Sequence, residues 1–411
     1  MFLLLASATL SSLAVEAENI PILRTRSKVV TVIDGDHKRV NYWHLMPDRN
    51  PDIYYVEIPM KPHTVIFQSD LDSIAFDTTY GKRHDFIIML NGEAAYPTQI
   101  RVEYRSMHPY TRTKEALDDG PDVIPFRLGE RNEIYLDGKL NGGELLALTL
   151  DLGAGGSVVN KDSLPKINMR FDGTASLINS DGNHAVPASS SNRLEIAGLR
   201  WEGLPFVVAQ NIKQGDDGLV GNSLFQGKVI EINYDQGNIR IHSTLPPIDP
   251  TYTRHPILIE NHIPYIHGSF TVGEARREGW FMFDTGAWTS RLPVGNGGRV
   301  PKLLDEFRKM AGMSGPQLTI GSHTLTGFNY RPEGGPGDSD RIGVLGRDLL
   351  KRFNTILDNQ NGYIYLQPNH LLNQPYRNPD YVMARIILVF GGGLAFIIAW
   401  WGFKRREKRR A

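Results

Sequence analysis

Residues 219–242, LVGNSLFQGKVIEINYDQGNIRIH, align without a gap with residues 344–367, VLGRDLLKRFNTILDNQNGYIYLQ. The two stretches lie 125 positions apart, so that Gly221 matches Gly346 and Ile239 matches Ile364. Self-similarity at a fixed offset is typical of a duplicated structural unit. The repeat therefore predicts two copies of one fold in this chain.

Two further blocks recur in the same order. ELLALTLDLGAGGSVV at 144–159 matches REGWFMFDTGAWTSRL at 277–292, and LEIAGLRWEGL at 194–204 matches LTIGSHTLTGF at 318–328. Three blocks in one order, found twice, make coincidence a poor explanation. We expect residues 129–245 and 246–370 to form two copies of one β unit, joined by the proline-rich stretch LPPIDP.

Short apolar runs that alternate with polar residues dominate the body of the chain, among them VVTVI, YYVEI, VIEINY and YIYLQ. Alternation with a period of two is typical of half-buried strands, so we expect an all-β protein. The stretch KLLDEFRKMAGM at 302–313 predicts a helix. Residues 19–128 contain several such runs but no copy of the repeated blocks, and they predict a separate N-terminal β domain.

Composition excludes several kinds of site. The 411 residues include no cysteine, which rules out a disulfide framework, a thiolate metal site and a cysteine nucleophile. The 45 basic and 45 acidic residues cancel, but the tail KRREKRRA at 404–411 carries a surplus of five positive charges and leaves about −5 upstream. A body with that balance binds nucleic acid poorly, so we expect no nucleic-acid partner.

Both ends have the composition of targeting segments. Residues 1–17 predict a signal peptide, although no basic residue precedes the apolar run and a buried N-terminal strand is the alternative. Residues 386–403 are uncharged and would span about 27 Å as a helix, which predicts a transmembrane helix rather than a buried core helix. The positive-inside rule then places the tail 404–411 in the cytoplasm. We expect a single-pass protein of the cell envelope, with its body outside the cytoplasm on a stalk at 371–385.

One aspartate recurs at the end of an apolar strand in each copy: Asp151 in LTLDLGAGG and Asp284 in FMFDTGAW. If the copies pack about a pseudo-two-fold axis, the two turns meet and the carboxyl groups face each other. Two buried carboxyl groups in contact share a proton, which provides one base for water and one acid for a substrate carbonyl. The alternative is a pair of ordinary turn aspartates, which does not explain why the aspartate recurs in the same block.

The second copy resembles the retropepsin-like aspartic proteases. Residues 283–287, FDTGA, look like the active-site loop, and residues 342–350, IGVLGRDLL, look like the hydrophobic-hydrophobic-glycine segment of that family. Over residues 129–370 the double copy is similar to the bilobal pepsin arrangement. The resemblance implies an aspartic endopeptidase acting on peptide or protein substrates without metal or cofactor, with a flap at 180–192. It also implies the site residues, which are catalytic Asp151 and Asp284 supported by Thr285, Gly286 and Gly153.

The first copy departs from the family pattern at Leu152, where a leucine replaces the threonine. At least half of the hydroxyl brace between the two loops is then absent, and lost orienting bonds lower reaction rates. A catalytically inactive scaffold that binds a peptide or an envelope partner is therefore the alternative function. Retention of both aspartates favours the enzyme, because a binding groove has no use for a buried carboxyl pair.

Two other kinds of site have weaker support. Taken alone, LTLDLGAGG resembles the cofactor loop of Rossmann-like methyltransferases, but Pro165 and further strands follow where that fold requires a helix. His242, His255, His262 and His267 lie close together in the sequence, yet their spacing matches no standard metal-ligand pair. We therefore expect no metal site.

Overall fold

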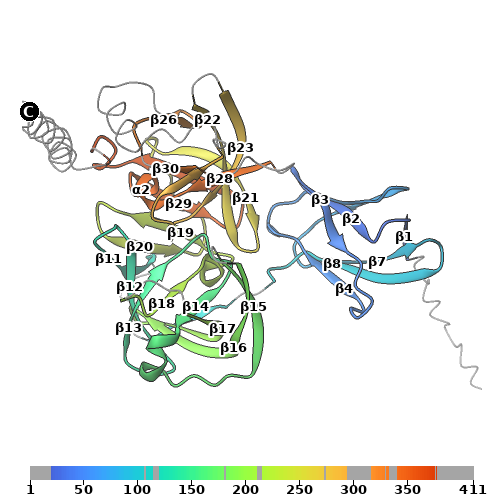
Figure 1. Cartoon of the computed structure of the whole chain (residues 1–411), viewed down its shortest axis with the longest axis horizontal. Coiled ribbons are helices and arrows are strands. Elements are labelled where there is room, and N and C mark those ends of the chain that lie inside the picture. The colour runs from blue at the N-terminus through green and yellow to red at the C-terminus, as the bar shows by residue number, and fades with distance from the viewer. Residues whose placement is uncertain are drawn as a thin grey trace, which may run out of the picture. The chain divides into compact units, whose positions relative to one another are not determined.

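The computed structural model describes residues 20–105, 108–113, 120–179, 182–210, 215–272, 275–293, 316–328, 330–332, 340–374 and 376. The chain divides into one compact unit that ends at Glu103 and a second that begins at Tyr104. Strands form nearly all of the regular structure in both (Figure 1), which confirms the expectation of a mostly β protein.

Several predicted segments lie outside the described residues. They are the signal peptide at 1–17, the helix at 302–313, most of the stalk at 371–385, the transmembrane helix at 386–403 and the tail at 404–411. Each of them stays a prediction. Within the part of the chain that is described, no helix has the length and apolar character needed to span a membrane.

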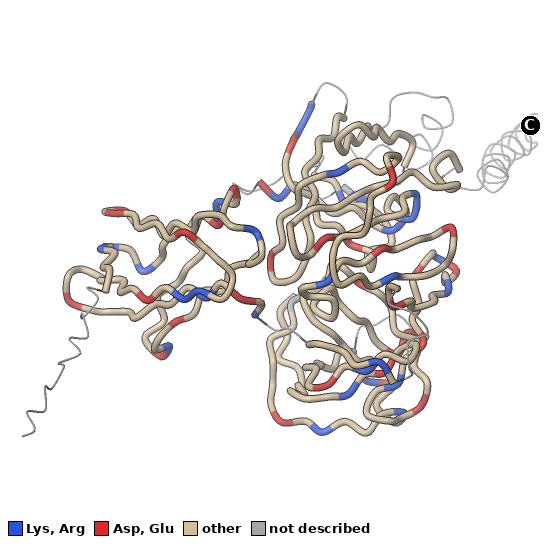
Figure 2. The backbone as a smooth tube through the Cα atoms, turned by 180° about the vertical axis from the view of Figure 1, so that it is seen from behind, with Lys and Arg blue, Asp and Glu red and all other residues tan. Residues whose placement is uncertain are grey.

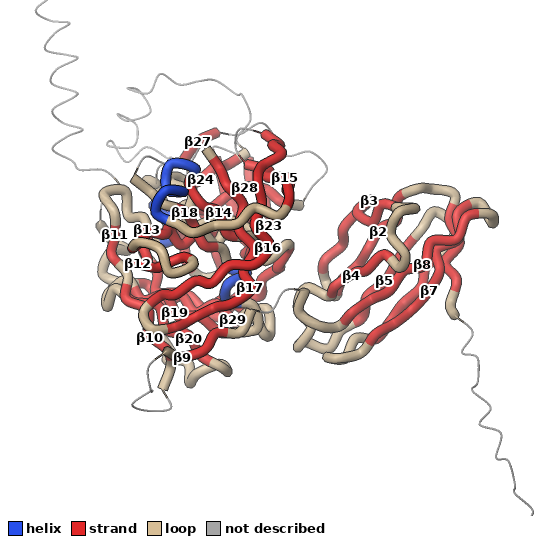
Figure 3. Tube along the Cα trace, turned by 90° about the horizontal axis from the view of Figure 1, so that it is seen from below, coloured by secondary structure: helices blue, strands red, loops and turns tan. Residues whose placement is uncertain are grey.

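The N-terminal unit is a pair of four-stranded sheets that face each other across one core (Figure 3). The first sheet has the order β1 (Ile22–Thr25), β7 (Arg83–Leu90), β8 (Ala94–Arg101), β4 (Asp52–Tyr55), and the second has the order β3 (His37–His44), β2 (Val29–Asp34), β5 (Thr64–Gln68), β6 (Ser73–Asp77). Residues along β2 alternate between buried and partly exposed, as the period of a strand requires. Edge-to-face contacts among Trp43, Tyr54, Phe67 and Phe86 fill the space between the sheets.

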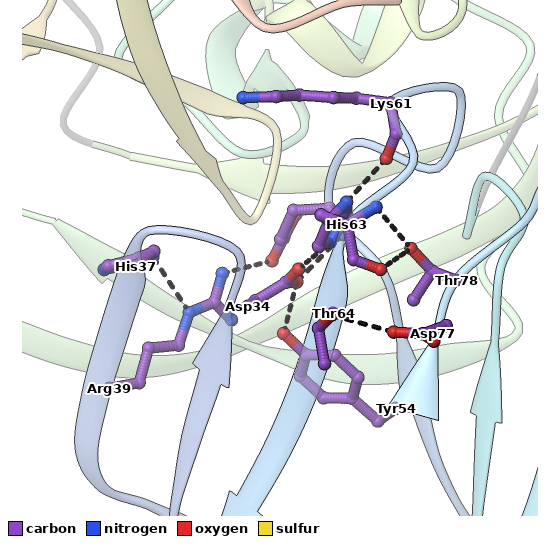
Figure 4. A network of polar contacts seen from close by, with 10 residues as sticks. Asp34, His37, Arg39, Tyr54, Lys61, His63, Thr64, Asp77 and Thr78 are labelled. Atoms are coloured by element: carbon purple, nitrogen blue, oxygen red, sulfur yellow. Dashed lines mark hydrogen bonds and ion pairs between the residues drawn. The ribbon is translucent and has the colours of Figure 1, made fainter. Parts of the chain in front are cut away.

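A polar network joins the end of β2 to β4 and to the residues before β5 in this unit (Figure 4). The Asp34 carboxylate accepts hydrogen bonds from His63 and from the Tyr54 hydroxyl, the latter at 2.6 Å. The other ring nitrogen of His63 lies 2.6 Å from the carbonyl oxygen of Lys61. A carbonyl and a carboxylate both accept hydrogen bonds, so each ring nitrogen must donate and His63 is held as the imidazolium. With both nitrogens engaged, the imidazole has no free position at which to act as a base.

This ion pair predicts how the stability of the unit depends on pH. Burial lowers the pKa of His63, but the hydrogen bond and charge of Asp34 outweigh it and raise that pKa. Burial opposes ionisation of Asp34, but His63 and Tyr54 lower its pKa. The stabilisation from His63 is therefore complete below the unfolded pKa of histidine and is lost as pH rises through the raised folded value, while that from Asp34 is lost as pH falls. Hydrogen exchange of β2 and β5 should show protection falling above neutral pH.

Substituting His63→Gln should flatten this alkaline loss of protection, because the group that titrates is gone. His44→Gln provides a matched control, since His44 ends β3 in the same unit and is exposed. Parallel pH curves for the wild type and His63→Gln would contradict the assignment of the loss to His63.

In the second unit, the first lobe contains the first copy of the repeated blocks. Its elements are β12 (Ile134–Leu140), β13 (Leu145–Leu150), β14 (Ser157–Asn160), the 3-10 helix η1 (Lys161–Lys166), β15 (Gly173–Asn179), β16 (Gly182–Ile196), β17 (Leu199–Ala209), β18 (Gly218–Val220) and the 3-10 helix η2 (Asn222–Phe225). After β13 the chain continues into β14 and a short 3-10 helix that contains Pro165. This order excludes the methyltransferase-like strand-to-helix turn.

The second lobe repeats this plan. Its elements are β22 (Ile263–Val272), β23 (Ala275–Phe283), β24 (Ser290–Leu292), β25 (Gln317–Ile320), β26 (His323–Leu325), β27 (Tyr330–Pro332), β28 (Arg341–Leu345) and α2 (Arg347–Leu350). In the first lobe β13 pairs with β18 in parallel while β14 pairs with β18 antiparallel. In the second lobe, likewise, β23 pairs with β28 in parallel and β24 pairs with β28 antiparallel. The matched sequence blocks therefore fold into matched strand pairings.

One continuous sheet joins the lobes. It has the order β10 (Asp122–Pro125), β20 (Asn238–His242), β19 (Val229–Asn233), β29 (Phe353–Asp358), β30 (Tyr363–Pro368), β21 (Thr253–Glu260). At its centre β19 of the first copy pairs antiparallel with β29 of the second, with Ile230 opposite Leu357. Equivalent strands of the two copies thus lie on either side of a pseudo-two-fold axis, which gives the second unit a two-lobed β architecture.

The N-terminal unit is shorter than predicted. The sequence predicts a domain at 19–128, whereas the compact unit ends at Glu103. Of the following residues, β9 (Tyr110–Arg112) pairs with β17, β10 with β20, and β11 (Arg127–Leu128) with β12. These short strands are completed by partners in the second unit that lie far away in the sequence, so local patterning could not assign them.

Charged residues of both signs are interspersed along both units (Figure 2). Some are paired at the surface, as Arg83 is with Asp85 and Arg276 with Glu278. Exposed pairs of this kind add little to stability, so the buried cores of the sheets hold the fold together.

Candidate active site

Parallel strand pairing places the two aspartates. β13 ends at Leu150 and β23 ends at Phe283, directly before Asp151 and Asp284. The Asp151 N–H donates to the carbonyl of Val220 at 3.0 Å, and the Asp284 N–H donates to the carbonyl of Leu345 at 3.0 Å. Each aspartate is therefore held at the end of its strand by the neighbouring hydrophobic segment, in the same way in both lobes.

The two carboxyl groups lie against each other and against two glycines. They are in hydrogen-bonding contact. A Cβ added to Gly153 would lie 2.4 Å from the Asp284 carboxyl carbon, and one added to Gly286 would lie 2.3 Å from that of Asp151. Each carboxyl thus packs over the glycine of the opposite loop, which leaves no room for any side chain there. We refer to Asp151 and Asp284 as the carboxyl pair.

The surroundings of the carboxyl pair favour protonation. Asp284 is buried, and Asp151 keeps partial exposure. Burial, then the charge of Asp284 and its hydrogen bond, raise the pKa of Asp151 to about 8. Burial also raises the pKa of Asp284. Two such groups in contact cannot both ionise, so the pair retains one proton well above the usual pH range of a carboxylic acid.

Backbone donors distinguish the two carboxyls. Asp284 Oδ1 accepts from the N–H groups of Gly286 at 2.9 Å and Ala287 at 2.7 Å. Asp151 Oδ1 accepts from the N–H of Gly153 at 2.9 Å. Hydrogen bonds from N–H groups stabilise the charged form of a carboxyl. This arrangement favours the proton on Asp151 and the charge on Asp284.

Thr285 ties the two loops together. Its hydroxyl, in a side chain that is 2% exposed, donates to the carbonyl of Leu150 and accepts from the N–H of Leu152, both at 2.9 Å. Leu152 occupies the matching position of the first lobe, is fully buried and has no hydroxyl. The hydroxyl brace between the two loops is therefore made by Thr285 of the second lobe, and Leu152 of the first lobe has no hydroxyl to add a second one.

Sequence reasoning missed Arg347 and Glu133. The Arg347 guanidinium lies 2.8 Å from the Glu133 carboxylate and donates to the carbonyl of Gly286 at 2.8 Å. The two side chains are 6% and 1% exposed. The one available signal was an arginine directly after Gly346 in the repeated block, where the first copy has Asn222. Nothing in the sequence around Glu133 marks this residue as the partner of Arg347.

The predicted flap region forms a hairpin. β15 and β16 pair antiparallel from Gly173 opposite Ala188 to Asn179 opposite Gly182. The pairing includes much of the stretch 180–192, although residues 180–181 are outside the described set. Among the described strands, β15 is at the outer edge of its sheet, so this edge of the hairpin has no partner strand there.

The four histidines noted in the sequence are dispersed. His242 contacts Glu231, His255 contacts Thr253, His267 stacks edge-on against Trp280, and the carbonyl of His262 accepts from Asn222. Over the described ranges, no group of three or more His, Asp or Glu side chains is arranged to hold a metal ion.

The comparisons with known proteins find similarity among solved structures. No protein-family model matches the chain, and no curated protein matches it. Among solved structures, the chain is similar to an aspartic proteinase from Irpex lacteus, with 12% identity and a TM-score of 0.46, over 62% of this chain and 99% of that one.

Proposed function

We propose that this chain is an aspartic endopeptidase, which hydrolyses peptide bonds with water and without a covalent intermediate. The observation that carries the proposal is the carboxyl pair, in which each carboxyl packs on the glycine of the opposite loop and lies against its partner. Burying two acids in contact costs stability, and titratable groups with perturbed pKa values cluster at functional sites. Because Asp151 is partly exposed, water and substrate can reach the carboxyl pair.

Each carboxyl has a defined role in this proposal. Asp284 takes a proton from water as the water oxygen attacks the carbonyl carbon, while Asp151 gives its proton to the carbonyl oxygen. In the second step Asp284 gives a proton to the leaving nitrogen, Asp151 recovers one from the tetrahedral hydroxyl, and the C–N bond breaks. The starting state has the proton on Asp151 because more N–H donors face Asp284. The β15–β16 hairpin is the proposed flap over the substrate.

The pH dependence of cleavage tests the proposal. Activity requires one proton on the pair, so it should fall as pH drops below the lower pKa and as pH rises through the higher one. Since the pKa of Asp151 is raised to about 8, we expect cleavage at neutral pH and an alkaline limb near pH 8. Initial rates of peptide release from a denatured protein check this. An alkaline limb in the acid range would contradict the described burial of the pair, and no cleavage at any pH would overturn the enzyme.

Leu152 favours a second candidate, an inactive scaffold that binds a peptide or an envelope partner. The first lobe lacks the hydroxyl that would complete the brace. Substituting Leu152→Thr distinguishes the two candidates. If the wild type is inactive and Leu152→Thr cleaves a denatured protein, the natural chain is the scaffold; if both cleave, it is the enzyme.

A further inference from the structure

An exposed tryptophan lies beside the carboxyl pair. Trp288 directly follows Ala287, whose N–H donates to Asp284 Oδ1 at 2.7 Å. Standard backbone dimensions then place the Cα atom of Trp288 within about 8 Å of the Asp284 carboxyl. The Trp288 side chain is 50% exposed, although burial of an indole is among the most favourable that a side chain can make. A large aromatic surface is therefore open to solvent next to the carboxyl pair.

A cation from the opposite lobe stacks on this indole. The Arg131 guanidinium lies 4.5 Å from the centroid of the Trp288 ring. Arg131 is exposed, and its N–H donates to the Glu133 carboxylate at 3.0 Å, which fixes its backbone ahead of β12. Within the described ranges the Arg131 guanidinium forms no ion pair. A guanidinium that stacks through its face keeps the N–H groups at its edge available to a carboxylate.

The repeat gives Trp288 a counterpart on the other side of the pseudo-two-fold axis. Gly155 matches Trp288, and a Cβ added to Gly155 would lie 2.8 Å from the carbonyl oxygen of Asn261 in the turn between β21 and β22. That position has no side chain and no room for one. The aromatic surface of Trp288 therefore has no equivalent at the matching place in the first lobe.

The charge at these two corners differs as well. Arg131 precedes Asn132 and Glu260 precedes Asn261, and both asparagines adopt a positive φ shortly before the strands β12 and β22. The Glu260 carboxylate is paired, since Arg341 Nη2 lies 2.6 Å from it. One corner thus has a cation without an acidic partner, whereas the matching corner has an acid that is neutralised.

We propose that Trp288 and Arg131 form a subsite for an acidic side chain of the substrate and are specificity-determining residues of the cleft. The proposal rests on the proposed function and deepens it by naming the class of peptide. The carboxylate of a substrate Asp or Glu binds the edge of the Arg131 guanidinium, and the methylene groups of that residue pack on the indole.

The geometry also limits where the acidic residue lies in the peptide. An extended peptide advances about 3.3 Å per residue, so the distance between the carboxyl pair and the indole corresponds to about two to four residues from the scissile bond. Because the matching corner at Gly155 and Glu260 differs in shape and charge, the acid is selected on one side of the bond.

The cleavage sites in a denatured protein test the subsite. Mass spectrometry of the released peptides gives the residues at each position around every cut made by the full-length chain. We expect Asp and Glu at one fixed position to exceed their frequency in the substrate by at least about threefold. Arg131→Gln should remove this enrichment, and Arg131→Glu should replace it with Lys and Arg. An active wild type without acidic enrichment would overturn the inference and leave the proposed function standing.

The tryptophan is tested through KM. Trp288→Ala should raise KM about fivefold for a peptide taken from an acidic cleavage site and change kcat less than twofold, because the indole binds substrate and transition state alike. Trp288→Phe should retain part of that affinity. Arg254→Gln is the matched control, since Arg254 stacks on Tyr363 at 4.9 Å in the sheet that joins the lobes, and it should leave KM and the cleavage profile unchanged. A wild-type KM in Trp288→Ala would contradict the assigned role.

Binding without cleavage separates the inference from the proposed function. The probes are two mixtures of fluorescent decapeptides that differ in one respect, glutamate in one where the other has glutamine. In full-length Asp284→Asn, fluorescence anisotropy should show the glutamate mixture binding about fivefold more tightly, and adding Arg131→Gln should make the two affinities equal. This result supports the inference even if the wild type cleaves nothing. Equal affinities in Asp284→Asn, or a glutamate preference that persists in Arg131→Gln, would overturn it.

Discussion

Substituting Asp284→Asn should reduce the rate of peptide hydrolysis by about 10³-fold or more, because an amide can neither take a proton from water nor share one with Asp151. The fold should survive. The amide matches the carboxyl in shape, and the substitution removes a buried acid whose neighbour already resists ionisation. Initial rates and the thermal midpoint, measured on the same preparation, check both parts. Asp151→Asn should lower the rate to a similar extent and leave the fold intact, since the two carboxyls act as a unit.

Asp162→Asn is the control for this prediction. Asp162 lies in η1 of the first lobe and is exposed, so the variant loses one carboxylate without touching the carboxyl pair. It should retain the wild-type rate. If Asp284→Asn keeps more than about a tenth of the activity, the hydrolysis does not depend on general acid-base catalysis by this pair.

Substituting Thr285→Val should be the most destabilising change at the site. Valine has nearly the shape of threonine but leaves the buried N–H of Leu152 and the carbonyl of Leu150 without their partner. Each unsatisfied group costs about 1–3 kcal/mol, so we expect a loss of about 2–5 kcal/mol in the free energy of unfolding the second unit. The rate of peptide hydrolysis should fall about 10²-fold, because the two loops no longer hold the carboxyls in position. Denaturant unfolding and cleavage kinetics measure the two effects.

Thr285→Ser distinguishes the hydroxyl from the packing of the side chain. Serine keeps the oxygen that makes both cross-lobe bonds and loses one buried methyl, for a cost of about 1 kcal/mol. Equal effects of serine and valine would show that packing, and not the brace, is what Thr285 contributes.

The repeat predicted much of the second unit. Because the blocks around Asp151 and Asp284 and those after Gly221 and Gly346 recur at matching places, the sequence alone predicts two copies of one β unit. Their packing about an axis entered the sequence analysis only as a condition for the two carboxyls to meet. The compact N-terminal unit ends at Glu103, before the predicted boundary, and the following short strands β9, β10 and β11 pair with β17, β20 and β12. Local alternation carries no information about such distant partners.

The site was predictable as far as it depends on the recurring motif. Asp151, Asp284, Thr285 and both glycines lie in matched turns, and their places follow from the repeat. Arg347 and Glu133 are far apart in the sequence and meet only because the two lobes pack together. The greater number of N–H donors at Asp284 is a property of loop geometry, which one sequence cannot show.

Cleavage in water enriched in oxygen-18 tests the central claim most directly. A carboxyl pair that activates water places one solvent oxygen in the new C-terminal carboxylate formed at each cleaved bond, without an enzyme-bound acyl species. We therefore predict peptides from a denatured protein that carry the heavy oxygen at their new C-termini at neutral pH, and none with Asp284→Asn. Folded wild-type protein that leaves every peptide bond intact from acid to alkaline pH, or an acyl-enzyme trapped during turnover, would contradict the account.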